Sequence, residues 1–168
     1  MSLSSSSRTL VDPSEEHALI EARDSRVHGR GVFARLAIPS NTSIIEYTGQ
    51  RITWKEAVRR HPHDPTQPHH TFYFHLESGR VIDAKINGNI ARWINHSCEP
   101  NCEAREEKGR VYIYALRALH AGEELFYDYG LEIDARYTAK LKREYACYCG
   151  HATCRGTMLA PKSRSKPT

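Results

Sequence analysis

The most informative stretch of the chain reads Arg92-Trp93-Ile94-Asn95-His96-Ser97-Cys98-Glu99-Pro100-Asn101. It contains one cysteine, Cys98, close to an asparagine and a histidine. Nearer the C-terminus, a C-x-C-x4-C cluster supplies three more thiols, from Cys147, Cys149 and Cys154. Three thiolates leave a tetrahedral zinc site one ligand short, and Cys98 would complete it. The sequence therefore predicts a four-cysteine zinc site that ties the C-terminal segment to the first stretch.

Length and composition fit one soluble globular domain. The chain has 168 residues, of which 39% are hydrophobic and 26% charged, and this length can bury a core. No apolar run approaches the ~20 residues that span a membrane, and the Ser-rich N-terminus lacks the apolar core of a signal peptide. We therefore expect an intracellular protein with reduced cysteines, in which Cys102 is a buried apolar side chain.

The charge pattern does not favour nucleic acid as a partner. The net charge is +4, and the Lys and Arg residues are scattered, with a basic, flexible tail expected at 161–168. Acidic residues gather in one region instead: Glu123, Glu124, Asp128, Glu132 and Asp134. That local charge would suit a cationic peptide better than a phosphate group.

Short strands dominate the expected secondary structure. Residues 1–16 are polar and Ser-rich, and we expect a disordered arm there. Six segments are β-branched or aromatic and bounded by turn residues, which predicts strands at 18–22, 43–47, 72–76, 81–83, 111–116 and 124–128. The fold class expected is mainly β with few short helices, an α+β arrangement of several small sheets.

Two helices are expected. Thr53-Trp54-Lys55-Glu56 is a capping-box pattern, and the helix that it starts should end before Pro62. A second helix is predicted at 134–145, with one stripe made of Tyr137, Leu141 and Tyr145. This stripe would either pack into the core or form an aromatic wall over a pocket. The segment 61–70 holds three prolines and four histidines, which favours an exposed loop over a histidine metal site.

Three further motifs matter, and the first two are weak when taken alone. His28-Gly29-Arg30-Gly31 contains a G-x-G, which alone indicates only a tight turn. Tyr47-Thr48-Gly49 ends an expected strand. Glu124-Leu125-Phe126-Tyr127-Asp128-Tyr129-Gly130 places Tyr127 and Tyr129 at i and i+2, on the same face of a regular strand.

Taken in order, these motifs resemble those of the SET-domain protein lysine methyltransferases that carry a zinc-binding post-SET segment. The family pattern R-F-x-N-H-S-C-x-P-N corresponds to Arg92–Asn101, with Trp93 in place of the usual Phe. The pattern E-L-x-x-D-Y-G corresponds to Glu124–Gly130. The resemblance runs over 21–159, more than four-fifths of the chain.

The resemblance implies a SET-domain fold of small curled sheets. In that fold the Asn95-His96 segment and the C-terminal tyrosine segment form a pseudoknot. The implied organisation is a SET catalytic domain at 17–136 with an insert at about 50–90, followed by a post-SET zinc-binding segment at 137–160. No cysteine-rich segment precedes residue 98, so the pre-SET zinc cluster of some family members is not expected.

The resemblance also implies methyl transfer from S-adenosyl-L-methionine to a lysine ε-amine of a histone or histone-like basic protein. The cofactor would lie on one face, with a lysine channel opening from the other. The implied cofactor-binding residues are His28, Gly29, Arg30, Gly31, Phe72, Arg92, Asn95 and His96. Family members often carry Tyr at the position of Phe72, so one hydroxyl contact would be lost. The implied Zn²⁺ ligands are Cys98, Cys147, Cys149 and Cys154.

The chemistry explains why tyrosines would line such a channel. A free lysine has a pKa of about 10.4, and an apolar aromatic channel next to a sulfonium disfavours its charged form. We expect Tyr129 to be the catalytic tyrosine and Tyr47 the second channel wall, with core packing as the alternative for each. Tyr127 occupies what resembles the Phe/Tyr switch of the family, which favours a mono- or dimethyl product.

The two histidines near the cysteines allow several roles. His96 could be a metal ligand, a general base or a cofactor contact, and the resemblance favours the cofactor. His151 lies inside the C-x-C-x4-C loop and is expected not to bind the metal.

Two other classes of function remain as alternatives. The first is a catalytically silent SET-fold binding or scaffolding module, which the presence of Tyr47, Asn95, His96 and Tyr129 disfavours. The second is a zinc-dependent nucleic-acid binder, which lacks the clustered basic face it would need. Neither nucleic acid nor a membrane is an expected partner. The protein would be cytoplasmic in a bacterium and nuclear in a eukaryote, and the target lysine and oligomeric state stay open.

Overall fold

The computed structural model describes residues 17–60 and 72–162. The strands of this part are β1 (Ile20–Asp24), β2 (Arg30–Ala34), β3 (Ser43–Tyr47), β4 (Gln50–Thr53), β5 (Tyr73–His75), β6 (Arg80–Asp83), β7 (Asn95–His96), β8 (Cys102–Glu107), β9 (Arg110–Ala115) and β10 (Phe126–Tyr127). The helices are α1 (Trp54–Arg60), α2 (Ala139–Glu144) and a 3-10 helix at Ile90–Trp93. The expected arm at 1–16, the loop at 61–70 and most of the tail at 161–168 lie outside the described residues.

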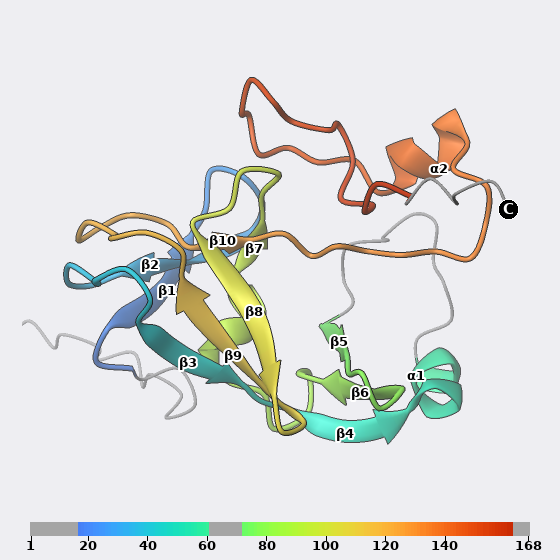
Figure 1. Ribbon diagram of the computed structural model, residues 1–168, viewed down its shortest axis with the longest axis horizontal. Coiled ribbons are helices and arrows are strands. Elements are labelled where there is room, and N and C mark those ends of the chain that lie inside the picture. The colour runs from blue at the N-terminus through green and yellow to red at the C-terminus, as the bar shows by residue number, and fades with distance from the viewer. Residues whose placement is uncertain (1–16, 61–71, 163–168) are drawn as a thin grey trace, which may run out of the picture.

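The strands form four small sheets, which confirms the mainly β class with few short helices. β1 and β2 form an antiparallel hairpin, and the two three-stranded sheets have the orders β3-β9-β8 and β4-β6-β5. Figure 1 shows the β3-β9-β8 sheet between that hairpin and the β4-β6-β5 sheet. In β9, Val111, Ile113 and Ala115 are buried, because alternate side chains of a strand point to the same face.

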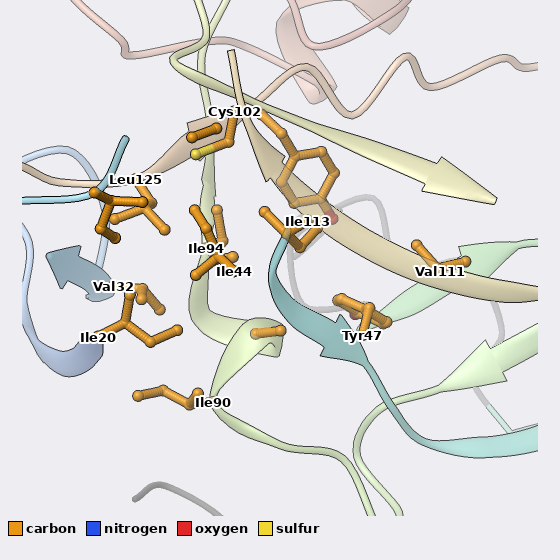
Figure 2. Packing of buried hydrophobic residues seen from close by; sticks show 14 of the residues in the cluster. Ile20, Val32, Ile44, Tyr47, Ile90, Ile94, Cys102, Val111, Ile113 and Leu125 are labelled. Carbon is orange, nitrogen blue, oxygen red and sulfur yellow. The ribbon is translucent and has the colours of Figure 1, made fainter. Parts of the chain in front are cut away.

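The largest core cluster lies where these sheets meet the 3-10 helix. Ile44 from β3, Ile113 from β9 and Ile94 just after the 3-10 helix belong to it (Figure 2). Tyr47, the last residue of β3, is also part of this cluster, so the core fixes the point where the Tyr47-Thr48-Gly49 motif begins. Cys102 is fully buried, as predicted, and burial raises the pKa of its thiol to about 12, which keeps it protonated.

The two most specific motifs lie side by side, as the resemblance implied. β7 and β10 pair in parallel, with Asn95 opposite Phe126 and His96 opposite Tyr127. The side chain of Asn101 holds this arrangement. Its Nδ2 donates to the backbone oxygen of Glu124 (2.8 Å), and its Oδ1 accepts from the backbone N–H of Phe126 (2.8 Å). Asn101 is buried, so the last residue of the first stretch anchors the second motif.

The helices differ in part from the prediction. α1 begins after Thr53, whose Oγ1 accepts from the backbone N–H of Glu56 (3.2 Å). The Glu56 carboxylate completes no capping box, because it pairs with Arg59 and Arg60 instead. The second helix was predicted at 134–145, and this was wrong at its start. α2 begins only at Ala139, because Thr138 caps it: Thr138 Oγ1 accepts from the backbone N–H of Leu141 (3.1 Å). Tyr137 therefore lies outside the helix.

Candidate active site

A cavity of about 600 Å³ lies against β7 and β10 and collects most of the predicted site residues. The predicted residues that line it are His28, Gly29, Arg30, Tyr47, Phe72, Arg92, Asn95, His96, Tyr127, Tyr129 and Cys147. Segments far apart in the sequence therefore meet around one volume. The C-terminal segment forms part of its wall through Ala146, Tyr148 and Met158. Figure 1 shows this segment, which follows α2, on one side of the molecule.

Several lining residues were missed by the sequence interpretation. Phe74, Tyr148 and Met158 line the cavity, although none of them was singled out. A signal for Tyr148 was present, since it lies between two cysteines that a metal would fix. Phe74 lies in β5, two residues after Phe72, which places both on one side of the extended backbone. Nothing around Met158 indicated a cavity.

Asn95 is held in one orientation by three acceptors. Its Nδ2 donates to the backbone oxygens of His28 (3.2 Å) and Arg30 (2.9 Å) and to Oε1 of Glu124 (3.1 Å). The amide nitrogen therefore faces these groups, and its carbonyl oxygen Oδ1 faces away from them. No described residue donates to that oxygen. Asn95 can consequently accept a hydrogen bond from a cationic amino group in the cavity.

The two glycines of the His28–Gly31 motif differ in their position relative to the cavity. Gly29 lines the cavity and has a φ of 46°, in the left-handed region that favours glycine. Gly31 is not among the lining residues. A Cβ at Gly31 would lie 2.2 Å from Oε1 of Glu124, the same atom that accepts from Asn95. Gly31 thus makes room for the carboxylate that orients Asn95.

An aromatic and cationic group forms another part of the cavity. The rings of Phe72 and Trp93 meet edge to face with centroids 5.1 Å apart. The guanidinium groups of Arg92 and Arg30 lie 5.1 and 5.3 Å from the Trp93 ring centroid. Trp93, which stands where the family pattern usually has Phe, therefore offers a broad indole ring that two guanidinium groups contact through cation–π interactions. Phe72 also uses its backbone oxygen to accept from the Tyr47 hydroxyl (3.3 Å).

The tyrosines cluster at the cavity as the sequence predicted. The Tyr129 hydroxyl donates to the backbone oxygen of Ile94 (2.6 Å), and its ring lies 4.9 Å from that of Tyr127. Tyr47 packs against Phe74 with ring centroids 5.5 Å apart. Burial raises the pKa values of Tyr47, Tyr127 and Tyr129 above the ordinary value of tyrosine. All three are therefore neutral near pH 7, and none can act as a tyrosinate base.

His96 is buried between the tyrosine motif and the cysteines. Its Nδ1 accepts from the backbone N–H of Tyr129 (3.1 Å), and its Nε2 lies 3.5 Å from Cys98 Sγ. Burial lowers the pKa of His96 to about 4, with the nearby charges of Asp128 and Arg155 acting in opposite directions. The imidazole is therefore neutral near pH 7.

The four cysteines converge as predicted. The sulfurs of Cys98, Cys147, Cys149 and Cys154 all lie within 4.8 Å of one another. Cys98 Sγ is 3.7 Å from that of Cys147 and 3.9 Å from that of Cys154. A disulfide would require about 2.05 Å between two sulfurs, whereas a zinc tetrahedron with Zn–S bonds of about 2.3 Å has sulfur–sulfur edges of about 3.8 Å. The donor set thus fits a structural zinc ion.

Local backbone groups also suit bound thiolates. Three sulfurs accept from backbone N–H groups, Cys98 from Arg155 (3.4 Å), Cys147 from Cys149 (3.4 Å) and Cys154 from Gly156 (3.3 Å). Burial raises the pKa of the Cys98 thiol, so its thiolate needs a cation nearby. His151 is not part of the cluster. Its Nδ1 lies 3.3 Å from Oε2 of Glu99 instead.

The acidic region does not form one patch. Three of its five residues are engaged inside the protein, Glu123 with Arg117, Glu124 with Asn95, and Asp128 with Arg155. Glu132 lines the cavity, and Asp134 lines a second hollow beside it. Neither Glu132 nor Asp134 forms an ion pair with another described residue. The predicted attraction for a cationic peptide therefore depends on these two carboxylates.

The chain belongs to the SET-domain family. The family model for the SET domain matches residues 29–130, a range that contains the tyrosines, Asn95 and Cys98. The four-cysteine cluster is compatible with a post-SET zinc site. In the part of the chain that the structure describes, no helix has the length and apolar character to cross a membrane.

Similar proteins carry names of one kind. The chain is 38% identical over 137 residues to a histone-lysine N-methyltransferase, H3 lysine-4 specific, from Chaetomium globosum, covering 79% of this chain and 12% of that protein. It is 36% identical over 143 residues to histone-lysine N-methyltransferase ash1 of Drosophila melanogaster, covering 83% and 6%. The chain therefore spans only a small part of the length of these relatives.

A solved structure has the same fold. A chain in the crystal structure of an active polycomb repressive complex 2 in the stimulated state superposes with a TM-score of 0.62 and 33% identity. The superposition covers 67% of this chain and 15% of that one. It confirms the SET-domain arrangement of small sheets.

Proposed function

We propose that this chain is an S-adenosyl-L-methionine-dependent protein lysine N-methyltransferase that acts on a histone or histone-like basic protein. One observation carries the proposal: a single cavity joins the Asn95 amide and the His28–Arg30 backbone to Tyr47, Tyr127 and Tyr129. The names of the similar proteins support histones as the substrate class. A histone substrate would place the protein in the nucleus of a eukaryote.

The polar part of the cavity fits the proposed cofactor. S-adenosyl-L-methionine supplies an electrophilic methyl group when it is bound. Asn95 offers Oδ1 to its ammonium group, since Nδ2 of the same amide is already used by acceptors. Gly29 lets the backbone approach closely, and the Phe72 and Trp93 rings offer apolar faces for an adenine. His28, Arg30, Arg92 and His96 line the same volume.

The tyrosine part fits a lysine side chain. The Tyr129 hydroxyl donates its hydrogen to the backbone oxygen of Ile94, so the lone pairs of the hydroxyl oxygen can accept a hydrogen bond from the incoming amine. Burial among Tyr47, Tyr127 and Tyr129 disfavours the ammonium form and lowers the pKa of the lysine. These side chains would hold the neutral amine in line with the methyl group of a bound cofactor, and such positioning would supply much of the rate. No carboxylate base is needed.

Tyr127 limits how many methyl groups are added. It is almost fully buried and borders the cavity, and its hydroxyl has no hydrogen-bond partner among the described residues. That hydroxyl can hold a water molecule or the amine itself, which leaves less room for a methylated nitrogen. We therefore propose a mono- or dimethyl product.

A zinc ion would fix the wall formed by the C-terminal segment. Cys98 lies two residues after the end of β7, whereas Cys147, Cys149 and Cys154 lie in the segment that carries Tyr148 and Met158. Zinc at these sulfurs would hold the two segments together. The division into a SET domain at 17–136 and a post-SET segment at 137–160 belongs to this proposal.

The test is a methyl-transfer assay with S-adenosyl-L-methionine and core histones, read by mass spectrometry of the products. Wild type should yield methyl-lysine, and Tyr129→Phe should reduce the rate strongly while cofactor binding, followed by calorimetry, persists. The silent binding module is not favoured, because both parts of the cavity are intact. Cofactor binding with no transfer to any basic protein would support it and contradict the proposal.

A further inference from the structure

His96 connects the metal site to the proposed catalytic tyrosine. Its side chain lies between the two, and the residue is only 5% exposed. Nδ1 lies 3.1 Å from the backbone nitrogen of Tyr129, and Nε2 lies 3.5 Å from Cys98 Sγ. Its ring also packs edge to face on the Tyr129 ring, with centroids 5.3 Å apart. Both ring nitrogens are thus engaged inside the protein.

The direction of these hydrogen bonds follows from their partners. A backbone N–H can only donate, so Nδ1 must accept from Tyr129 with its lone pair. In a neutral imidazole the other nitrogen then carries the proton. Nε2–H therefore points at Cys98 Sγ, and a thiolate at that position accepts it. The Cys98 sulfur thus has two donors, this one and the backbone N–H of Arg155.

Tyr129 is held at several points by the 94–96 segment. His96 fixes its backbone N–H and one edge of its ring, and the backbone oxygen of Ile94 fixes its hydroxyl (2.6 Å). A shift of the imidazole would therefore move the tyrosine that orients the amine. Asp128 Oδ1 also lies 3.5 Å from Nδ1, farther than the Tyr129 nitrogen, and this oxygen already accepts from Arg155 and from the backbone N–H of Gly130.

We propose that His96 is a positioning residue that couples the four-cysteine metal site to Tyr129 through one hydrogen bond at each ring nitrogen. The coupling rests on the proposed role of Tyr129. Groups that donate to a metal ligand from the second layer orient that ligand and tune its charge, and their loss costs about 10–100-fold in metal affinity or activity. Here the same side chain transmits the position of the ligand to the active site.

Two substitutions of His96 test its two hydrogen bonds separately, because each variant keeps one bond and removes the other. The oxygen of Asn reaches about as far as Nδ1, and the amide nitrogen of Gln about as far as Nε2. With Zn²⁺ as the metal, His96→Asn should weaken zinc affinity about 10–100-fold, measured by competition with a chromogenic chelator. It should leave the hydrogen-exchange protection of the Tyr129 amide in place. His96→Gln should retain zinc affinity, lose that protection, and lower kcat with little change in the KM of the cofactor.

The matched control is His151→Asn, since His151 lies between two of the cysteines and its ring contacts Glu99 rather than a sulfur. It should change neither zinc affinity nor the Tyr129 amide. In wild type, zinc removal should shift the Tyr129 amide resonance, which tests the coupling even if a variant does not fold. Wild-type behaviour in both His96 variants, or equal loss of both properties in both, would overturn the inference. These readouts do not need methyl transfer, so they stay valid if the proposed function fails.

Discussion

Arg155 and Asp128 form a two-point ion pair, with Nη1 to Oδ2 at 2.8 Å and Nη2 to Oδ1 at 3.0 Å. Asp128 belongs to the tyrosine motif and Arg155 to the cysteine loop, so the pair joins the core to the C-terminal segment. Burial raises the pKa of Asp128, but the hydrogen bonds from Arg155 and from the backbone N–H of Gly130, together with the nearby positive charge, more than offset this effect and hold the pKa below its usual value. Arg155 was not singled out from the sequence, because no pattern around Arg155 in the sequence indicates that it pairs with Asp128.

Arg155→Lys should loosen the C-terminal segment without unfolding the core. Lysine keeps the charge but loses the planar two-point geometry, and we expect a loss of about 1–2 kcal/mol in docking free energy. Hydrogen exchange of amides in 154–160 should rise, while amides of β8 and β9 stay protected. Arg117→Lys is the control, since its partner Glu123 lies in the core domain. Unchanged exchange at 154–160 would contradict this role.

Metal removal should affect only the C-terminal segment, and Cys102, a cysteine outside the four-cysteine cluster, provides the control. Chelation, or Cys98→Ser, should release the chain beyond about residue 146 and reduce methyl transfer, because one wall of the cavity is lost. Limited proteolysis should then cut near the cysteines and spare the sheets. Cys102→Ala removes a buried thiol that is not in the cluster, so it should retain zinc at the wild-type content. Full activity in a verified metal-free sample would refute this.

Gly31→Ala should weaken cofactor binding although Gly31 is not in the cavity wall. The new Cβ displaces the Glu124 carboxylate, and Asn95 loses one acceptor. One hydrogen bond of about 1 kcal/mol corresponds to roughly a fivefold higher Kd, measurable by calorimetry with S-adenosyl-L-methionine. Glu124→Gln keeps an acceptor oxygen and should cost less. Equal affinity of wild type and Gly31→Ala would show that Glu124 does not orient Asn95.

Tyr127→Phe should move the product toward higher methylation. Loss of the hydroxyl leaves space beside the nitrogen, so dimethyl and trimethyl peptides should increase in mass spectra. Tyr112→Phe serves as the control, because Tyr112 lies in β9 and is not among the cavity residues. A product that is mainly trimethyl-lysine already in wild type would exclude the proposed limit.

The pH profile should reflect the substrate rather than the tyrosines. A tyrosine is neutral below its pKa, and burial raises the pKa values of Tyr47, Tyr127 and Tyr129, so each stays neutral to higher pH than usual. kcat/KM should therefore rise as the lysine deprotonates, with no falling limb below about pH 10. The same slope is expected for Tyr129→Phe at a lower rate. A falling limb below that pH, absent from a tyrosine variant, would argue for a tyrosinate in the reaction.

Of the predictions that rested on local spacing, some were accurate and others were wrong in their bounds. The strand at 43–47 has the predicted bounds, because β-branched residues next to a turn already encode it. The cysteine cluster followed from ligand number and spacing. The helix at 134–145 failed because hydrophobic spacing was given more weight than Thr138, a good N-cap residue four positions in. The strand at 124–128 is only two residues long, since Asp128 turns the chain by accepting from the backbone N–H of Gly130 (3.0 Å).

Predictions that needed distant partners could not come from the sequence. The acidic residues at 123–134 are neighbours along the chain, but Glu123 and Asp128 face different arginines. The role of Gly31 depends on Glu124, which the β7–β10 pairing brings to Asn95. Likewise, the sequence placed His96 beside a metal ligand without showing which nitrogen faced it. Each of these contacts depends on how the folded chain brings distant residues together, which local sequence patterns do not specify.

The parallel pairing of β7 with β10 has a consequence for how the protein folds. All of β8 and β9 lies in the chain between these two strands, so their union closes a long loop over a hairpin that can form by itself. Such loop closures are slow, because the chain loses conformational entropy before the stabilising contacts between the two strands have formed. The catalytic centre is thus expected to be the last region to assemble. A nascent or damaged chain would hold folded sheets well before it could modify anything.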